Sequence, residues 1–166
     1  MLKEHAKLLV LLNESGEIIG RKKLQKIVYI SKKLKYDFQE RFNFHFYGPY
    51  SEELSLQIEE LTNLGFISEV KENKGGYNQY KYEINEQGKE YLELYPIQLE
   101  GLQGLVQTLN KESSRFLELV STVLYFDELE KDELVEKIQK VKSRQNYTTE
   151  EIDKAIQFIA QLSSLN

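Results

Sequence analysis

Apolar residues recur at helical spacing through the first 35 residues of the chain. In residues 2–14 the apolar positions are Leu2, Ala6, Leu9, Val10 and Leu12. They predict an amphipathic helix, which Gly16 is suited to end as a left-handed cap. The same spacing returns in residues 21–35, at Leu24, Ile27, Val28 and Leu34. The two segments, joined by SGEIIG, predict a helix-turn-helix start.

The pattern changes to a period of two over residues 42–47. The alternating residues are Phe42, Asn43, Phe44, His45, Phe46 and Tyr47. They predict a half-buried strand, and Pro49 is expected to end its pairing. Ser51 then has the side chain of a helix N-cap, and Gly65 can end that helix with Phe66 folded back onto it. The buried face of this third helix is predicted to be Leu54, Ile58 and Leu61.

Residues 66–84 predict a β-hairpin with Lys74-Gly75-Gly76 at its tip. Tyr80, Tyr82 and Ile84 alternate on one of its faces. Residues 84–94 then predict the end of a strand followed by a short helix. The order helix, helix, strand, helix, strand, strand, helix is that of a winged helix, in which the hairpin is the wing.

Beyond Pro96 the pattern is helical throughout, in four segments that cover residues 99–110, 113–126, 127–143 and 148–165. Thr148 and Glu151 have the spacing of a capping box. We therefore predict an α+β fold, mostly α, with a small antiparallel sheet. Residues 1–95 form a winged-helix-like domain, and residues 96–166 form a helical part that packs on it or mediates dimerisation. The apolar stripe from Phe116 to Phe126 suits either the core of the monomer or a symmetric dimer interface.

Composition and charge narrow the classes of function. The chain has 166 residues, a net charge of −5 and no cysteine. The lack of cysteine excludes disulfides, zinc–thiolate sites and cysteine nucleophiles, and the acidic balance disfavours broad binding to nucleic acid or anionic membranes. The start of the chain lacks a signal-peptide pattern, and no apolar run reaches the roughly 18 residues of a membrane span. We expect a cytoplasmic protein without a membrane partner.

Residue types that carry chemistry are sparse. The only histidines are His5, expected on the surface of the first helix, and His45, expected to be exposed or to flank the sheet. Neither has a second histidine or a carboxylate at metal-ligand spacing. The sequence also lacks a GxSxG elbow and the glycine-rich phosphate loops. We therefore predict no metal, no cofactor and no catalytic residue, and a protein that is not an enzyme.

A basic cluster stands out in residues 21–35. Its members are Arg21, Lys22, Lys23, Lys26, Lys32, Lys33 and Lys35. The cluster suits contacts with phosphates or with an acidic partner, above all through Arg21, Lys22 and Lys23, or it is the solvated back of an amphipathic helix. The predicted third helix, in contrast, carries Glu52, Glu53, Glu59 and Glu60. Carboxylates placed beside phosphates oppose binding, so this charge disfavours DNA recognition through the usual face of a winged helix.

The 11 tyrosines add interface candidates. Large amphipathic rings suit protein interfaces and also the core of a small sheet. The core is the better interpretation for Tyr80 and Tyr82. Tyr77, beside the tip of the predicted wing, is the better interface candidate.

Two short motifs together resemble the YwgA-like family. GRKKLQKIVYI matches the helical pattern G-[RK]-x-x-L-Q-K-[LI]-x-Y, and FYGPYSEEL matches the turn Y-G-P-[YVF]-S. The matching residues are Gly20, Leu24, Gln25, Lys26, Tyr29, Tyr47, Gly48, Pro49, Tyr50 and Ser51. The resemblance extends over most of the chain, and over residues 20–67 a looser form of the pattern is similar to the SocA-like Panacea domains.

The resemblance implies protein binding rather than catalysis. YwgA-like proteins are described as predicted regulators, and Panacea domains are associated with antitoxins and with adaptors that hand a partner protein to a protease. The leading hypothesis is a non-enzymatic protein-interaction or regulatory module, of the adaptor or antitoxin-like kind, with a homodimer as a further option. The rival is a DNA-binding winged-helix transcriptional regulator that uses the lysines of the second helix.

The double motif also has a structural interpretation. If the turn packs against the second helix, the amide of Gln25 is expected to bond backbone groups of the turn, and Lys26 to meet Glu52 or Glu53. The motif then either only locks the helix–turn–helix geometry or also binds a partner. The sequence leaves both open.

Overall fold

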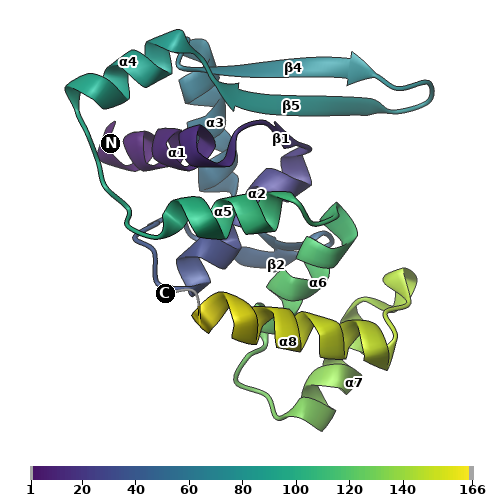
Figure 1. The fold of residues 1–166 in the computed structure, drawn as a ribbon. Coiled ribbons are helices and arrows are strands. Elements are labelled where there is room, and N and C mark those ends of the chain that lie inside the picture. Colours follow the sequence, from purple (N-terminus) through teal and green to yellow (C-terminus); the bar gives the residue numbers. More distant parts are fainter. Residues whose placement is uncertain (1, 165–166) are drawn as a thin grey trace.

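A computed structural model of the chain describes residues 2–164, which form eight α-helices, one short 3₁₀ helix and five strands (Figure 1). The helices are α1 (Leu2–Ser15), α2 (Arg21–Lys33), α3 (Glu52–Asn63), α4 (Glu86–Leu94), α5 (Leu102–Asn110), α6 (Ser114–Tyr125), α7 (Lys131–Val141), η1 (Ser143–Gln145) and α8 (Thr149–Ser164). The strands are β1 (Ile18–Ile19), β2 (Asn43–His45), β3 (Gly48–Tyr50), β4 (Ile67–Asn73) and β5 (Asn78–Ile84). The mostly α, α+β fold class predicted from the sequence is confirmed.

The predicted hairpin is the main part of a three-stranded antiparallel sheet with strand order β1-β5-β4. The ladder between β4 and β5 runs from the pair Ile67–Ile84 to the pair Asn73–Asn78. It projects from the body of the molecule, away from α7 and α8 (Figure 1). The third strand is β1, which lies in the SGEIIG link and pairs Ile18 with Tyr82. From its sequence, that link is expected to be only a turn between two helices.

The prediction for residues 42–47 was only partly right. β2 pairs with β3 in a separate two-stranded sheet, not with the β4–β5 hairpin. Pro49 lies inside β3 opposite Phe44 instead of ending the pairing. A proline is tolerated there because both strands of a two-stranded sheet are edge strands, with one side free of ladder hydrogen bonds. Phe46, expected to be half-buried, lies in the turn between the strands and is 59% exposed. The winged-helix topology stays a prediction.

Both ends of α3 follow the local signals in the sequence. The Ser51 hydroxyl accepts a hydrogen bond from the Leu54 N–H at 3.0 Å. At the other end Gly65 has a left-handed backbone with φ of 82°. The N–H groups of Gly65 and Phe66 bond the carbonyls of Thr62 and Leu61, at 3.1 and 3.0 Å. This pairing satisfies the last carbonyls of the helix in a Schellman motif.

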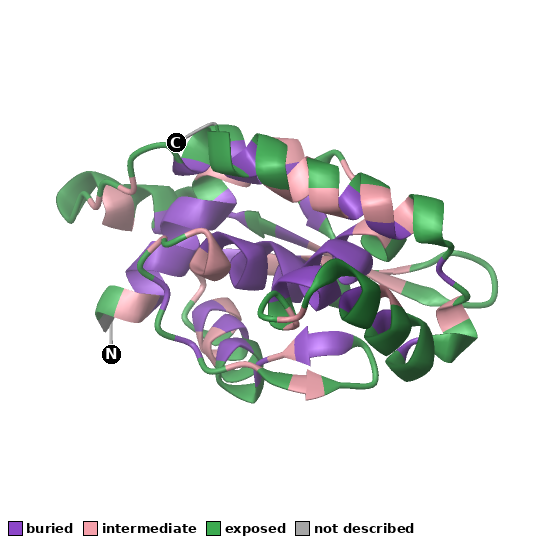
Figure 2. Ribbon diagram, turned by 90° about the horizontal axis from the view of Figure 1, so that it is seen from below, coloured by how far each residue is buried: buried purple, intermediate pink, exposed green. Residues whose placement is uncertain are grey.

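One continuous hydrophobic core joins the two halves of the chain. α5 packs on α1, and α6 packs on α2. The apolar stripe of α6 is buried inside the single chain, at Leu117, Leu119, Val120, Val123 and Leu124. Figure 2 shows buried residues on the inner sides of the helices and exposed residues outside. The core of the monomer therefore accounts for the stripe, and the domain boundary at residue 96 stays a prediction.

The remaining C-terminal helices are present with changed boundaries. α5 begins at Leu102 and not at Leu99. α7 begins at Lys131 and not at Asp127, because the chain turns after α6 with a bond from the Leu129 N–H to the Phe126 carbonyl. The capping box of α8 is present, with Thr148 and Glu151 bonded to each other's backbone N–H at 3.1 Å. Leu165, the last residue of that predicted helix, lies outside the described residues. No helix within residues 2–164 has the length and apolarity to cross a membrane.

Candidate functional site

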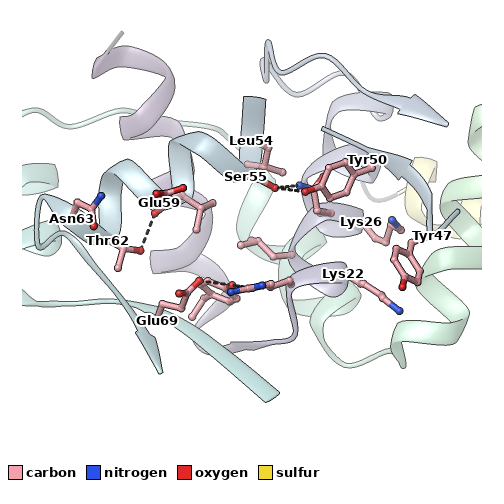
Figure 3. Close-up of a pocket in the computed structure, with 15 residues that line it drawn as sticks. Lys22, Lys26, Tyr47, Tyr50, Leu54, Ser55, Glu59, Thr62, Asn63 and Glu69 are labelled. Carbon is pink, nitrogen blue, oxygen red and sulfur yellow. Dashed lines mark hydrogen bonds between the residues drawn. The ribbon is translucent and has the colours of Figure 1, made fainter. Parts of the chain in front are cut away.

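A groove of about 580 Å³ lies between α2 and α3 and extends from the β2–β3 turn to the β4–β5 sheet (Figure 3). We call it the α2–α3 groove. Its lining residues are Arg21, Lys22, Leu24, Gln25, Lys26, Tyr47, Tyr50, Leu54, Ser55, Ile58, Glu59, Thr62, Asn63, Glu69 and Tyr82. Both sequence motifs contribute to this lining. The structure therefore brings the helical motif and the turn motif to one site.

Gln25 connects α2 to the start of α3. Its side-chain Nε2 donates to the Ser51 carbonyl at 2.8 Å, and its Oε1 accepts from the Ser51 N–H at 2.9 Å. Nε2 also lies 3.0 Å from the hydroxyl of Ser55. The predicted role of Gln25 toward the turn backbone is confirmed. Since a buried amide needs all of these partners, the bonds fix the turn against α2.

Lys26 lies one residue further along α2, and it is almost completely buried. Its Nζ donates to the Pro49 carbonyl at 2.9 Å. The predicted contact with Glu52 or Glu53 was wrong: a Glu53 oxygen instead accepts from the Arg41 N–H at 3.0 Å. Burial lowers the pKa of Lys26 to about 8; the charge of Glu118 raises it, and those of Lys142 and Lys22 lower it.

The buried carboxylate beside Lys26 comes from the C-terminal half of the chain. A Glu118 oxygen lies 3.6 Å from Nζ of Lys142, and Tyr147 and Gln145 also bond this oxygen, at 3.3 and 3.2 Å. Lys142 itself donates to the Phe46 carbonyl at 2.7 Å. Nothing in the spacing of the chain predicted that Glu118, Lys142 and Tyr147 meet here. A carboxylate within the apolar LELV segment of α6 was the one available signal.

The backbone of Gly48 fits a narrow space between these groups. Its φ of 85° is left-handed, a region that residues with a Cβ rarely adopt. A Cβ at this position would lie 3.5 Å from Glu118 and Thr122 and 3.6 Å from the Lys26 side chain. These are ordinary van der Waals distances, so the backbone conformation and not the space calls for glycine here.

The motif tyrosines divide into one core residue and two groove residues. Tyr29 is buried, with its ring 5.0 Å from that of Phe42, and burial raises the pKa of its phenol. Tyr50 lines the groove and shares a 2.8 Å hydrogen bond with Ser55. Tyr47 is 43% exposed at the end of the groove, under Nζ of Lys22 at 3.6 Å from the ring centroid. Of the three, Tyr47 is best placed to meet a partner.

Most of the basic cluster contacts the protein itself. Arg21 bonds the Tyr82 hydroxyl at 3.2 Å and lies over the ring of Tyr80. Lys23 donates to the Asn110 carbonyl at 2.6 Å. Lys32 bonds the Glu40 carbonyl, and Lys33 lies 3.4 Å from Asp127. The cluster is therefore mainly a seam between α2 and its neighbours, not a row of solvated cations.

The two histidines are not among the residues that line this groove, and their surroundings differ. His5 was expected on the surface, but it is buried, with its Nε2 3.1 Å from a Glu60 oxygen. α3 covers α1 on that side. The spacing of apolar residues in α1 did not predict this contact. His45 is exposed beside the ring of Tyr50. Residues 2–164 contain no group of three or more carboxylate and histidine side chains able to hold a metal ion.

The sequence has a full-length relative. A protein of Bacillus subtilis (strain 168) named "Uncharacterized protein YwgA" is 57% identical over 165 residues, which is 99% of either chain. The chain belongs to the YwgA-like family. No protein-family model matches it.

The polar groups of this groove divide into buried residues that hold its wall and exposed residues that reach solvent. Gln25, Lys26 and Ser51 are buried and bonded to backbone or neighbouring side chains, so they hold the wall in place. Lys22 and Tyr47 reach solvent from that wall. Tyr77, the interface candidate chosen from the sequence, is 63% exposed near the tip of the hairpin, but it is not part of the groove lining.

Proposed function

We propose that this YwgA-like protein is a non-enzymatic protein-interaction and regulatory module, of the adaptor or antitoxin-like kind, and that it binds its partner at the α2–α3 groove. One observation carries the proposal: residues of both motifs meet on this groove, where buried bonds fix the wall and Tyr47 and Lys22 stay accessible. Tyrosine is enriched among the central contacts of protein interfaces.

DNA binding has weaker support. Of the three residues predicted to contact phosphates, Arg21 and Lys23 bond groups of the protein itself, and Lys22 is held over the Tyr47 ring. The exposed side of α3 carries Glu52, Glu53 and Glu59. Carboxylates on this side of α3 would lie beside phosphates and oppose the release of counterions that drives DNA binding.

A direct test is to search for a stoichiometric partner. The full chain with an affinity tag is expressed in its native cell, cross-linked in place and purified, and the mass of the complex is measured. We expect a defined complex with one protein. A control variant with Lys154→Glu reverses the charge of an exposed lysine on α8, outside the groove. This variant should retain the complex. The chain recovered alone, or bound to genomic DNA with a steep salt dependence, would count against the proposal.

A further inference from the structure

The two ends of the α2–α3 groove carry opposite charge. Lys22 and Lys26 line it beside Tyr47, at the end next to the β2–β3 turn (Figure 3). Glu59 and Glu69 line it at the other end, near Thr62 and Asn63 (Figure 3). Arg21 also lines the groove and interacts with Glu69, so it offsets part of the negative charge and leaves two carboxylates against one cation. Between the two ends the lining includes the apolar side chains of Leu54 and Ile58. The groove is therefore directional. A ligand with opposite charges at its two ends meets charges of opposite sign in one orientation and like charges in the reverse orientation.

The basic end holds more positive charge than its surroundings neutralise. Lys26 and Lys142 are both buried, and the carboxylate near them is that of Glu118. Lys22 adds an exposed ammonium group at the same end, held over the Tyr47 ring. Burial lowers the pKa of Lys142 as it does that of Lys26. Lys22 is the exposed ammonium group at this end, and the buried charges of Lys26 and Lys142 lie behind it, so this end favours an anionic group.

The acidic end retains a carboxylate for a cation. Glu69 accepts a 2.7 Å hydrogen bond from the Tyr82 hydroxyl, which in turn bonds Arg21. Glu59 is exposed on α3, and among residues 2–164 no ion pair is formed by its side chain. Because Glu69 is held in place and Glu59 is free to adjust, the pair suits the ammonium or guanidinium group of a ligand.

We propose that the groove binds a short segment of a partner protein in one direction, with a carboxylate at Lys22, an apolar side chain over Leu54 and Ile58, and a lysine or arginine at Glu59 and Glu69. This rests on the proposed function. A volume of about 580 Å³ is that of a small-ligand pocket, so a few residues fill it. A polypeptide segment carries both signs of charge, whereas a nucleic acid would meet repulsion at the acidic end.

A phage-displayed library of random heptapeptides, panned against the purified full chain, is the first test. We expect enriched sequences to carry an acidic residue and a basic residue in one fixed order, with an apolar residue between them. Parallel panning against Lys22→Glu should abolish the enrichment of the acidic residue, and panning against Glu59→Lys that of the basic one. Enrichment without a fixed order, or no enrichment at all, overturns the proposal.

Synthetic peptides of the selected sequence provide the quantitative test, by fluorescence anisotropy with the same full-length variants. Lys22→Glu and Glu59→Lys should each weaken binding roughly 10-fold or more, since like charges are then opposed. The double variant should bind a peptide whose acidic and basic residues are exchanged more tightly than it binds the original peptide. Lys154→Glu and Glu90→Lys, exposed changes on α8 and α4, should leave affinity unchanged. Equal affinity of all variants for the original peptide overturns the proposal.

The two proposals fail in distinguishable ways. If the cross-linked complex forms in the native cell and also forms with Lys22→Glu and Glu59→Lys, the protein still binds a partner, but the directional groove is overturned. If a fluorescent DNA duplex binds the full chain and Lys22→Glu abolishes that binding, the same surface serves nucleic acid, and both proposals fall.

Discussion

The side chain of Gln25 pairs with both backbone groups of Ser51, 26 residues further along the chain. The amide thus takes the place of a neighbouring strand, because it offers a donor and an acceptor at the spacing of one residue. Ser51 also caps α3 with its hydroxyl. One residue of α2 therefore sets where α3 begins, and with it the position of the groove wall that α3 supplies.

Replacing Gln25 by alanine should destabilise the protein. The change leaves a buried N–H and a buried carbonyl of Ser51 with fewer partners, and an unsatisfied buried polar group costs roughly 1–3 kcal/mol. We expect a loss of about 2 kcal/mol in the free energy of unfolding, measured by urea denaturation. Gln103→Ala on the exposed side of α5 is the matched control and should change little. Equal stability of the two variants would show that the pairing is dispensable.

The change of glycine to alanine should have opposite signs at two positions. Gly48→Ala forces a Cβ into a left-handed backbone with φ of 85°, which costs roughly 1–2 kcal/mol. Gly104 lies within α5, where a Cβ would meet nothing within 4 Å. Gly104→Ala should stabilise the protein by up to about 1 kcal/mol, because alanine favours a helix. Thermal unfolding of both variants beside the unchanged chain measures the difference, and a shift of the same sign in both would contradict it.

Lys26 should make stability rise with pH in the alkaline range. Its folded-state pKa of about 8 lies below the ordinary value of 10.5. Between these values the unfolded chain binds more protons, so the free energy of unfolding increases with pH. Lys26→Met removes this contribution and keeps much of the packing. From pH 8 to pH 9.5 we expect the unchanged chain to gain on the order of 1–2 kcal/mol relative to Lys26→Met. The free energy of unfolding of Lys154→Met should change with pH as that of the unchanged chain does. If Lys26→Met also follows the unchanged chain, Lys26 does not titrate in this range.

Glu40 should destabilise the protein at neutral pH. Its carboxylate is buried, and within the described part of the chain neither oxygen accepts a hydrogen bond from another residue. Burial raises its pKa; its own backbone N–H and Lys32 lower it, and Glu4 and Glu53 raise it further. For an acid with a raised folded-state pKa, stability is highest below the unfolded pKa and is lost as pH rises through the folded one.

Glu40→Gln removes that charge. The variant should be more stable than the unchanged chain by roughly 1 kcal/mol at pH 7, and the difference should vanish below the ordinary carboxyl pKa of about 4.5. Urea unfolding at both pH values measures it. Glu90→Gln, on the exposed side of α4, should show no such dependence. A gain that persists unchanged in acid would point to packing, not to the charge.

Predictions that depended on neighbouring residues were the most accurate. Ser51 as a cap, Gly65 as a left-handed stop and the Thr148–Glu151 capping box are each satisfied within a few residues of backbone. The bond from Gln25 to the turn was found because the motif named both partners. The partner of Lys26, the Pro49 carbonyl, was not predicted. Several nearby acidic residues fitted the spacing, and every residue has a backbone carbonyl, so the sequence does not indicate which carbonyl accepts the bond.

Long-range contacts account for the other differences. β1 is two residues long and exists only because β5 lies beside it. His5 is buried by α3, and the carboxylate that faces Lys26 comes from α6. Each of these depends on where a distant element packs, and helical periodicity identifies the apolar face of an element without naming the element that covers it.

By itself, the sequence determined the helices, the hairpin, the caps that end them and the family of this protein, because backbone hydrogen bonding and side-chain period act over a few residues. Only the tertiary structure decided that Lys22, Tyr47 and Glu59 share one groove, and that Lys26 and Lys142 share one carboxylate. Packing of the core sets those distances. The opposed charges of the groove arise from side chains that three separate elements bring together.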